Sequence, residues 1–208
     1  MRWYFRFQLS LRDIEELLFE RGVIVSYETI RRWCDKFGPA FACRVKVARR
    51  KPGSTWHLDE MAVTLRGEPY PLWRAVDEHG VELDVPLQKR RDKAAAKRFF
   101  QRVLRTCPIP RTIVTDQLRS YPAAMADIPE LAHVKHVFVK AAARVNNRAE
   151  KSHQPTRERE RCMRGFRDPT CTQAFLESFG LIRQHFALKQ HLLRASLYRK
   201  HLAVVFST

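Results

Sequence analysis

The segment WHLDEMAVTL, residues 56–65 of this 208-residue chain, begins the pattern from which the fold can be predicted. Its apolar side chains recur with a period of two, which predicts a β-strand. A turn at residues 66–68, a second strand at 70–76, another turn and a third strand at 81–87 follow. The pattern therefore predicts a three-stranded antiparallel meander.

The rest of the pattern alternates helices and strands. We expect an amphipathic helix at residues 91–106, a short apolar strand at 111–115, a helix at 118–126 and a strand at 133–139. A polar, helix-like segment then begins near residue 146. Three antiparallel strands followed by helix, strand, helix, strand and helix is the order of a ribonuclease-H-like fold, an α/β class with a mixed five-stranded sheet and flanking helices.

Three acidic residues lie where this fold can bring them together. Asp59 lies inside the first strand, Asp116 ends the fourth, and Glu150 begins the polar helix-like segment. Side chains alternate along a strand, so Asp59 and Glu60 should point to opposite faces. We expect Asp59 to be the inward one, and to become a neighbour of Asp116 if their strands pair, because α/β sheets place ligands at the carboxyl ends of strands.

Carboxylate oxygens of this kind are suited to Mg²⁺, or to Mn²⁺. Two such ions about 3.5–4 Å apart support an in-line phosphoryl displacement. The sequence therefore predicts metal-dependent chemistry on a polyanion, with Asp59, Asp116 and Glu150 as both metal ligands and catalytic residues.

Each acid also has a structural interpretation. Asp116 could only cap a following helix, and Glu150 could bond its own helix start in a capping box with Asn147. Pro155 could leave Glu150 in a kinked segment. Arg157, two helical turns after Glu150, is either a phosphate contact or part of a solvated helix, and His153 is either a phosphate contact or a surface histidine.

The N-terminal part predicts a small helical module. Residues 9–38 read as two helices around Gly22, with Ser26 capping the second and Gly38-Pro39 ending it. In the second helix, we expect Tyr27, Ile30, Trp33 and Phe37 to point inward. This arrangement predicts a helix-turn-helix, with an ordinary helical hairpin as the alternative. The residues expected to contact DNA are Tyr27, Arg31, Arg32, Lys36, Arg49, Arg50, His153 and Arg157.

We expect four regions: a helix-turn-helix module at residues 1–38, a basic linker at 39–55, the catalytic core at 56–167, and a helical region at 168–208 that packs on the core. The formal net charge is +17, and basic segments flank the strands. An excess of this size favours a phosphate-rich partner, a nucleic acid, over an acidic protein, and basic segments on both sides of the strands are expected of an enzyme core held on a duplex such as double-stranded DNA.

Five cysteines without a C-x-x-C pair make a disulfide framework or a zinc site an unfavoured interpretation. No apolar run approaches the roughly 18 residues of a membrane span, and the N-terminus does not read as a signal peptide. We therefore expect a cytoplasmic protein without membrane contact.

Several motifs together resemble one family of bacterial transposases. They are RFQLSLRDIEELL at residues 6–18, VSYETIRRW at 25–33, FGP at 37–39, WHLDE at 56–60, LWRAVD at 72–77, KAAA at 93–96, TD at 115–116, SY at 120–121, NNRAE at 146–150 and SH at 152–153. In this order they resemble the insertion-sequence-six family of DDE transposases, which form cointegrates replicatively. The resemblance covers residues 2 to about 167.

The resemblance implies an integrase-like catalytic core with Asp59, Asp116 and Glu150 as the metal-binding triad and Arg157 as the basic residue downstream. It also implies DNA cleavage and strand transfer at terminal inverted repeats, a homo-oligomer, and a bacterial, nucleoid-associated protein. Gln117 and Lys151 depart from the family pattern, and family members begin with a further helix, so we expect a truncated N-terminus. A ribonuclease-H-like nuclease and an inactive DNA-binding remnant are the alternatives.

Overall fold

The antiparallel hairpin forms as the alternating pattern predicts. In the computed structural model, β1 (Thr55–Leu65) pairs with β2 (Glu68–Asp77). Arg66 and Gly67 connect them, both with positive φ, which is the backbone of a tight two-residue hairpin turn. The structure describes residues 1–139, 147–187 and 194–207, and for residues 147–150 and 205–207 it describes the backbone only.

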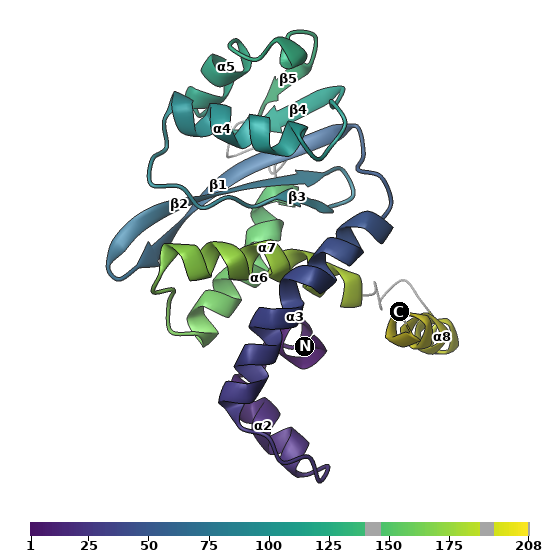
Figure 1. Cartoon of the computed structure of the whole chain (residues 1–208). Helices are drawn as coiled ribbons and strands as arrows, with labels where there is room; N and C mark the ends of the chain where they lie inside the picture. Colours follow the sequence, from purple (N-terminus) through teal and green to yellow (C-terminus); the bar gives the residue numbers. More distant parts are fainter. Residues whose placement is uncertain (140–146, 188–193, 208) are drawn as a thin grey trace. The chain divides into compact units, whose positions relative to one another are not determined.

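The five strands form one mixed sheet in the order β3-β2-β1-β4-β5 (Figure 1). β3 (Glu82–Asp84) is antiparallel to β2, whereas β4 (Thr112–Thr115) is parallel to β1 and β5 (Lys135–Phe138) is parallel to β4. A meander extended by two parallel strands beside its first strand is the ribonuclease-H-like topology. The predicted fold class is confirmed, although β3 is shorter than the seven-residue strand that we expected.

The two faces of the sheet are covered differently. On one face, α4 (Lys93–Leu104) and α5 (Ser120–Met125) bury an apolar core that includes Trp56, Leu58 and Trp73, and the short helix η1 (Pro129–Leu131) adds Leu131. On the other face, α6 (Asn147–Cys162) contacts β1 and β2. Figure 1 shows α4 and α6 on opposite sides of the sheet.

The chain forms two compact units. Residues 50–173 contain the sheet, and residues 1–49 together with 174–208 form a helical unit. The helical unit contains α1 (Arg2–Arg6), α2 (Leu11–Phe19), α3 (Tyr27–Ala48), most of α7 (Pro169–Phe186), and α8 (Ala195–Ser207). Ser10 and Ser26 accept backbone hydrogen bonds at the starts of α2 and α3, as N-caps do.

The prediction that Gly38 and Pro39 end the second helix is wrong, because α3 continues to Ala48 and takes in most of the expected linker. Its buried residues are Ile30, Cys34, Gly38 and Ala42, one every four positions. This stripe packs with Phe5, Phe179 and Ile182 in one apolar cluster. Continuous burial along one face therefore outweighs the break that proline favours.

The expected inward face of α3 is also partly wrong. Ile30 is buried, but Trp33 and Phe37 are 42% and 46% exposed. The buried stripe follows a four-residue spacing and so passes to one side of both rings. In α7, Phe179 and Ile182 belong to the helical unit, whereas Gln173 belongs to the sheet unit, where it accepts a hydrogen bond from the backbone N–H of Leu87.

None of the helices in the described ranges is both long enough and apolar enough to span a bilayer.

Candidate active site

Two of the predicted acids meet through strand pairing. β1 and β4 are parallel neighbours, with His57 opposite Val114. Two residues further along each strand, Asp59 and Asp116 therefore lie side by side at the carboxyl end of β4. One oxygen from each of Asp59, Glu60 and Asp116 lies within 4.8 Å of the others. The expectation that Asp59 and Asp116 become neighbours is confirmed.

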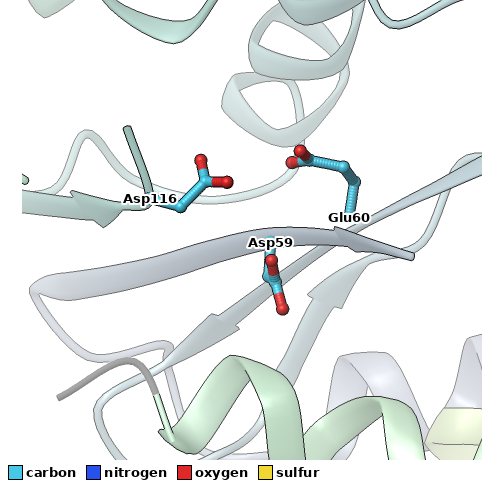
Figure 2. A group of neighbouring side chains, drawn as sticks. All are labelled: Asp59, Glu60 and Asp116. Atoms are coloured by element: carbon cyan, nitrogen blue, oxygen red, sulfur yellow. The ribbon is translucent and has the colours of Figure 1, made fainter. Parts of the chain in front are cut away.

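Glu60 joins this group from the opposite face of β1, as strand alternation predicts. Figure 2 shows Glu60 and Asp116 on one side of the strand and Asp59 directed to the other. The hydroxyl of Tyr121 donates to Oε2 of Glu60 at 2.7 Å, and the guanidinium of Arg91 contacts Oε1. The sequence interpretation set Glu60 aside because it expected Asp59 to be the inward acid, whereas the Glu60 side chain is the more buried of the two, and it missed Tyr121 and Arg91 as parts of the site.

Burial is the main cause of the pKa shifts of Glu60 and Tyr121. Burial raises the pKa of Glu60, and the nearby charge of Asp116 raises it further. The hydrogen bond from Tyr121 and the contact with Arg91 act in the opposite direction. Burial, followed by the Glu60 carboxylate, raises the pKa of Tyr121 well above its usual value. The tyrosine hydroxyl therefore keeps its proton and remains the donor in this pair.

Asp116 divides its oxygens between two partners. Oδ1 accepts a hydrogen bond from the backbone N–H of Leu118 at 3.0 Å, so the local turn that a capping role would need is present. Oδ2 lies 3.6 Å from Arg91. Asp116 can therefore stabilise the local turn through Oδ1 and still belong to the acidic cluster through Oδ2.

Asp59 lies on the α6 side of the sheet. Its Oδ2 is 3.4 Å from Nε2 of His153, whose side chain is only 3% exposed. Burial lowers the pKa of His153, although Asp59 opposes that shift. The interpretation of His153 as a surface histidine is wrong.

A cleft of about 500 Å³ opens beside Asp59. It is lined by Asp59, His153, Gln154, Arg157 and Arg161. One carboxylate and two guanidinium groups therefore share a cleft that can admit a phosphate. Arg157 lines the same cleft as Asp59, and its role as a phosphate contact stays a prediction.

Arg74 fixes α6 against the sheet. It is paired with Asp59 in the β1–β2 register, so both side chains point to the α6 face. Its guanidinium donates to the carbonyl of Ser152 and to Oγ1 of Thr156 at 2.6 Å, and lies 3.4 Å from Glu82. Burial lowers the pKa of Arg74, and Glu82 opposes that shift. A charged residue inside the apolar strand LWRAVD was the signal that could have identified it.

The third predicted acid is placed only by its backbone. Glu150 belongs to the first turn of α6, which begins at Asn147. Its side chain, and the capping box proposed with Asn147, lie outside the described residues. α6 continues as a helix through Pro155, so the alternative of a segment that is no longer helical at this proline is not observed.

The remaining predicted contacts to DNA lie in the helical unit or at its end. Tyr27, Arg31, Arg32 and Lys36 lie on α3, with Arg49 as its C-cap and Arg50 next to it. Arg31 forms an ion pair with Glu28 at 2.6 Å, as the solvated-helix alternative expects. Arg32, Lys36 and Arg50 are exposed.

The donor set suits a hard divalent cation. One carboxylate oxygen of Asp59 and one of Asp116 lie within 4.8 Å of each other, and the two side chains are partly exposed at 18% and 34%. Mg²⁺ and Mn²⁺ prefer oxygen ligands and retain several waters, so partial exposure is compatible with them. The residues present therefore fit a divalent metal ion.

Sequence comparison gives two kinds of match. A family model described as a DDE domain matches residues 53–190. The transposase for insertion sequence-like element IS431mec of Staphylococcus aureus is 33% identical over 158 residues, which cover 76% of this chain and 70% of the relative. The transposase for insertion sequence element IS257 in transposon Tn4003, also from Staphylococcus aureus, is 32% identical over the same shares.

Solved structures resemble the chain more distantly. The trimeric and dimeric forms of the HTLV-2 integrase catalytic core domain in complex with magnesium are 13% and 17% identical, with TM-scores of 0.47 and 0.42. They cover 70% and 50% of this chain, and 92% and 67% of the integrase chains. With the fold and the meeting of Asp59 and Asp116 established above, the match to the DDE domain and to these transposases shows that the chain belongs to the insertion-sequence-six family of DDE transposases, which are polynucleotidyl transferases.

Proposed function

We propose that this transposase cuts a DNA strand at the ends of an insertion sequence and joins the freed 3′-hydroxyl to target DNA. The observation that carries the proposal is the meeting of Asp59 and Asp116 oxygens at the carboxyl end of β4. Carboxylates at this edge of the sheet can bind metal next to a phosphate. The family match to known transposases favours strand transfer over simple hydrolysis.

Asp59, Asp116 and Glu150 are the proposed ligands of Mg²⁺ or Mn²⁺. A pair of divalent ions would activate the attacking hydroxyl and neutralise charge on the leaving oxygen. Support comes from the oxygen donors of Asp59 and Asp116 and from the place of Glu150 in the first turn of α6, the helix that contacts β1.

The cleft beside Asp59 would receive the scissile phosphate. Arg157 and Arg161 line it and can donate to phosphate oxygens, which orients the phosphorus for in-line attack. His153 is buried at the same cleft, so its proposed phosphate contact would be made inside the cleft and not on an open surface.

The helical unit would bind the terminal inverted repeats. Tyr27, Arg31, Arg32 and Lys36 on α3 are the proposed contacts, with Arg49 and Arg50 following the helix. Most of the cations among them are exposed, and the chain has a net charge of +17. A homo-oligomer is proposed because two DNA ends must meet for joining, and a nucleoid location follows from the DNA substrate.

A strand-transfer assay with labelled ends and a target plasmid tests this function. Asp59→Asn, Asp116→Asn and Glu150→Gln should each lower joining by about 10³-fold or more, because each removes charge from the metal site. Asp127→Asn is the matched control, since Asp127 pairs with Lys93 and Lys97 away from the acidic cluster. It should join DNA as the unaltered chain does.

The outcomes separate the alternatives. Nicked DNA without joined products would make the chain a nuclease. Binding to repeat DNA without cleavage in Mg²⁺ or Mn²⁺ would make it a DNA-binding remnant. Full joining by Asp116→Asn would refute the assignment of the site.

A further inference from the structure

Arg91 lies directly beside the acidic cluster. Its guanidinium contacts Oε1 of Glu60 and lies 3.6 Å from Oδ2 of Asp116. The residue is in the segment that precedes α4, and its side chain is 51% exposed. A positive charge therefore touches two of the three carboxylates of the cluster.

Glu60 orients this arginine more readily than it could bind a metal ion. Its side chain is only 3% exposed. Its two oxygens already face different partners, since Tyr121 donates to Oε2 and Arg91 contacts Oε1. A carboxylate whose oxygens are both engaged would have to lose one bond to coordinate an ion, which costs more in a buried place than in water.

The two oxygens of Asp116 are not equally engaged. Oδ1 accepts a hydrogen bond from Leu118, so Oδ2 is the less engaged oxygen, and it is the atom that faces Arg91. A guanidinium and a divalent ion at one carboxylate oxygen repel each other and also compete for the same lone pairs.

We propose that Arg91 competes with the divalent metal ion for Asp116, so that it weakens metal binding until the guanidinium moves away. This inference rests on the proposed function, because it takes Asp116 as a metal ligand. The half-exposed side chain has room to move from the cluster toward solvent or toward a DNA phosphate, and Glu60 gives it a fixed position to return to.

The inference is tested by the affinity of the protein for Mn²⁺, and not by its turnover. We would titrate the full chain with Mn²⁺ by isothermal calorimetry at fixed ionic strength. Arg91→Gln should bind Mn²⁺ about five- to tenfold more tightly, because it removes a positive charge near the ligand in a partly screened site. Arg91→Met should show the same gain, and Arg91→Lys, which keeps the charge, should stay near the unaltered affinity.

Arg90→Gln is the matched control. Arg90 is the preceding residue and is exposed. Its replacement removes the same charge from the same segment, so it should change affinity by less than about twofold at 0.15 M salt, because an exposed charge that does not contact the acids is screened there. An equal gain for Arg90→Gln and Arg91→Gln, or no gain for either, would overturn the inference.

Asp116→Asn separates failure of the inference from failure of the proposed function. If Asp116→Asn leaves Mn²⁺ affinity unchanged, or if the unaltered chain binds no Mn²⁺, the metal site itself is misassigned. If Asp116→Asn abolishes binding while Arg91→Gln and Arg91→Met bind no more tightly than the unaltered chain, only the competition by Arg91 is wrong.

Discussion

Arg74 is a buried arginine, and its contribution to stability depends on the partners of its guanidinium. It is 4% exposed, donates to α6 through Ser152 and Thr156, and faces Glu82. Arg74→Met should lower the free energy of unfolding of the sheet unit by about 3–5 kcal/mol, because Glu82 would lose its ionic partner in a buried place. Hydrogen exchange of the β2 amides across a urea series measures this.

A double variant tests the physical reason for that loss. Arg74→Met with Glu82→Met replaces both charges by apolar side chains of similar length. Replacing a buried pair in this way is often close to neutral, so the double variant should regain at least about half of the lost stability. If the double variant is as unstable as Arg74→Met, the hydrogen bonds to α6, and not the unpaired charge, carry the effect.

Individual residues show which parts of the site could be predicted from the sequence alone. The backbones of Asp59 and Asp116 could be placed side by side from the strand order of the expected fold, but alternation along the strand could not predict that the Asp116 side chain lies on the side of Glu60. Glu60 could be assigned to the face opposite Asp59 by alternation. Its partners could not be predicted, since Arg91 and Tyr121 are 31 and 61 residues away and reach it only through the path of the intervening loops.

The start of β1 depends on the turn that follows β2. The carboxylate of Glu78 accepts hydrogen bonds from the backbone N–H groups of Ser54 and Thr55, and it lies so close to Gly53 that a Cβ there would collide with it. Burial alone would raise the pKa of Glu78, but backbone hydrogen bonds outweigh it, so the pKa is lowered. The charged carboxylate therefore favours the folded state.

The sign of the pH dependence follows from this lowering. Stabilisation by Glu78 is present above the ordinary glutamate pKa of about 4.3 and is lost as the pH falls through the lower folded value. Glu78→Gln should weaken protection of the β1 amides by up to about 1 kcal/mol at pH 7, with a smaller difference at pH 3.5. Hydrogen exchange at both pH values checks this.

Glu68→Gln is the control at the other end of the same hairpin, where the side chain is exposed. It should leave protection of the β1 amides unchanged at both pH values. If Glu78→Gln lowers the protection of the β1 amides equally at pH 7 and pH 3.5, the glutamine side chain destabilises the turn for a reason other than the missing charge.

Elements with a strong local period were predictable, and those that depend on distant packing were not. β1 and β2 lie within two residues of the expected bounds at each end because their apolar pattern repeats inside the element. α3 exceeds its expected end because its buried face, which includes Gly38, packs against Phe5 in one apolar cluster. That contact comes from a segment more than thirty residues away.

The net charge of the protein is a global property that follows directly from its sequence. The formal net charge is +17. The described cations are not equivalent, because some are neutralised by carboxylates, as Arg31 is by Glu28, whereas Arg32 and Lys36 are exposed on α3. DNA affinity should therefore depend on which cations are removed, and not only on how many.

Salt dependence measures this difference. Each phosphate contact adds about 0.9 to the slope of log affinity against log salt concentration, so Arg32→Ala with Lys36→Ala should lower the slope for repeat DNA by about 1.8. Arg199→Ala with Lys200→Ala removes the same charge from exposed positions on α8 and should leave the slope nearly unchanged. Fluorescence anisotropy between 50 and 200 mM salt, a range over which such slopes are resolved, supplies the comparison. Equal losses for both pairs would mean that the whole basic surface binds DNA without preference, and α3 would lose its proposed role in recognising the repeats.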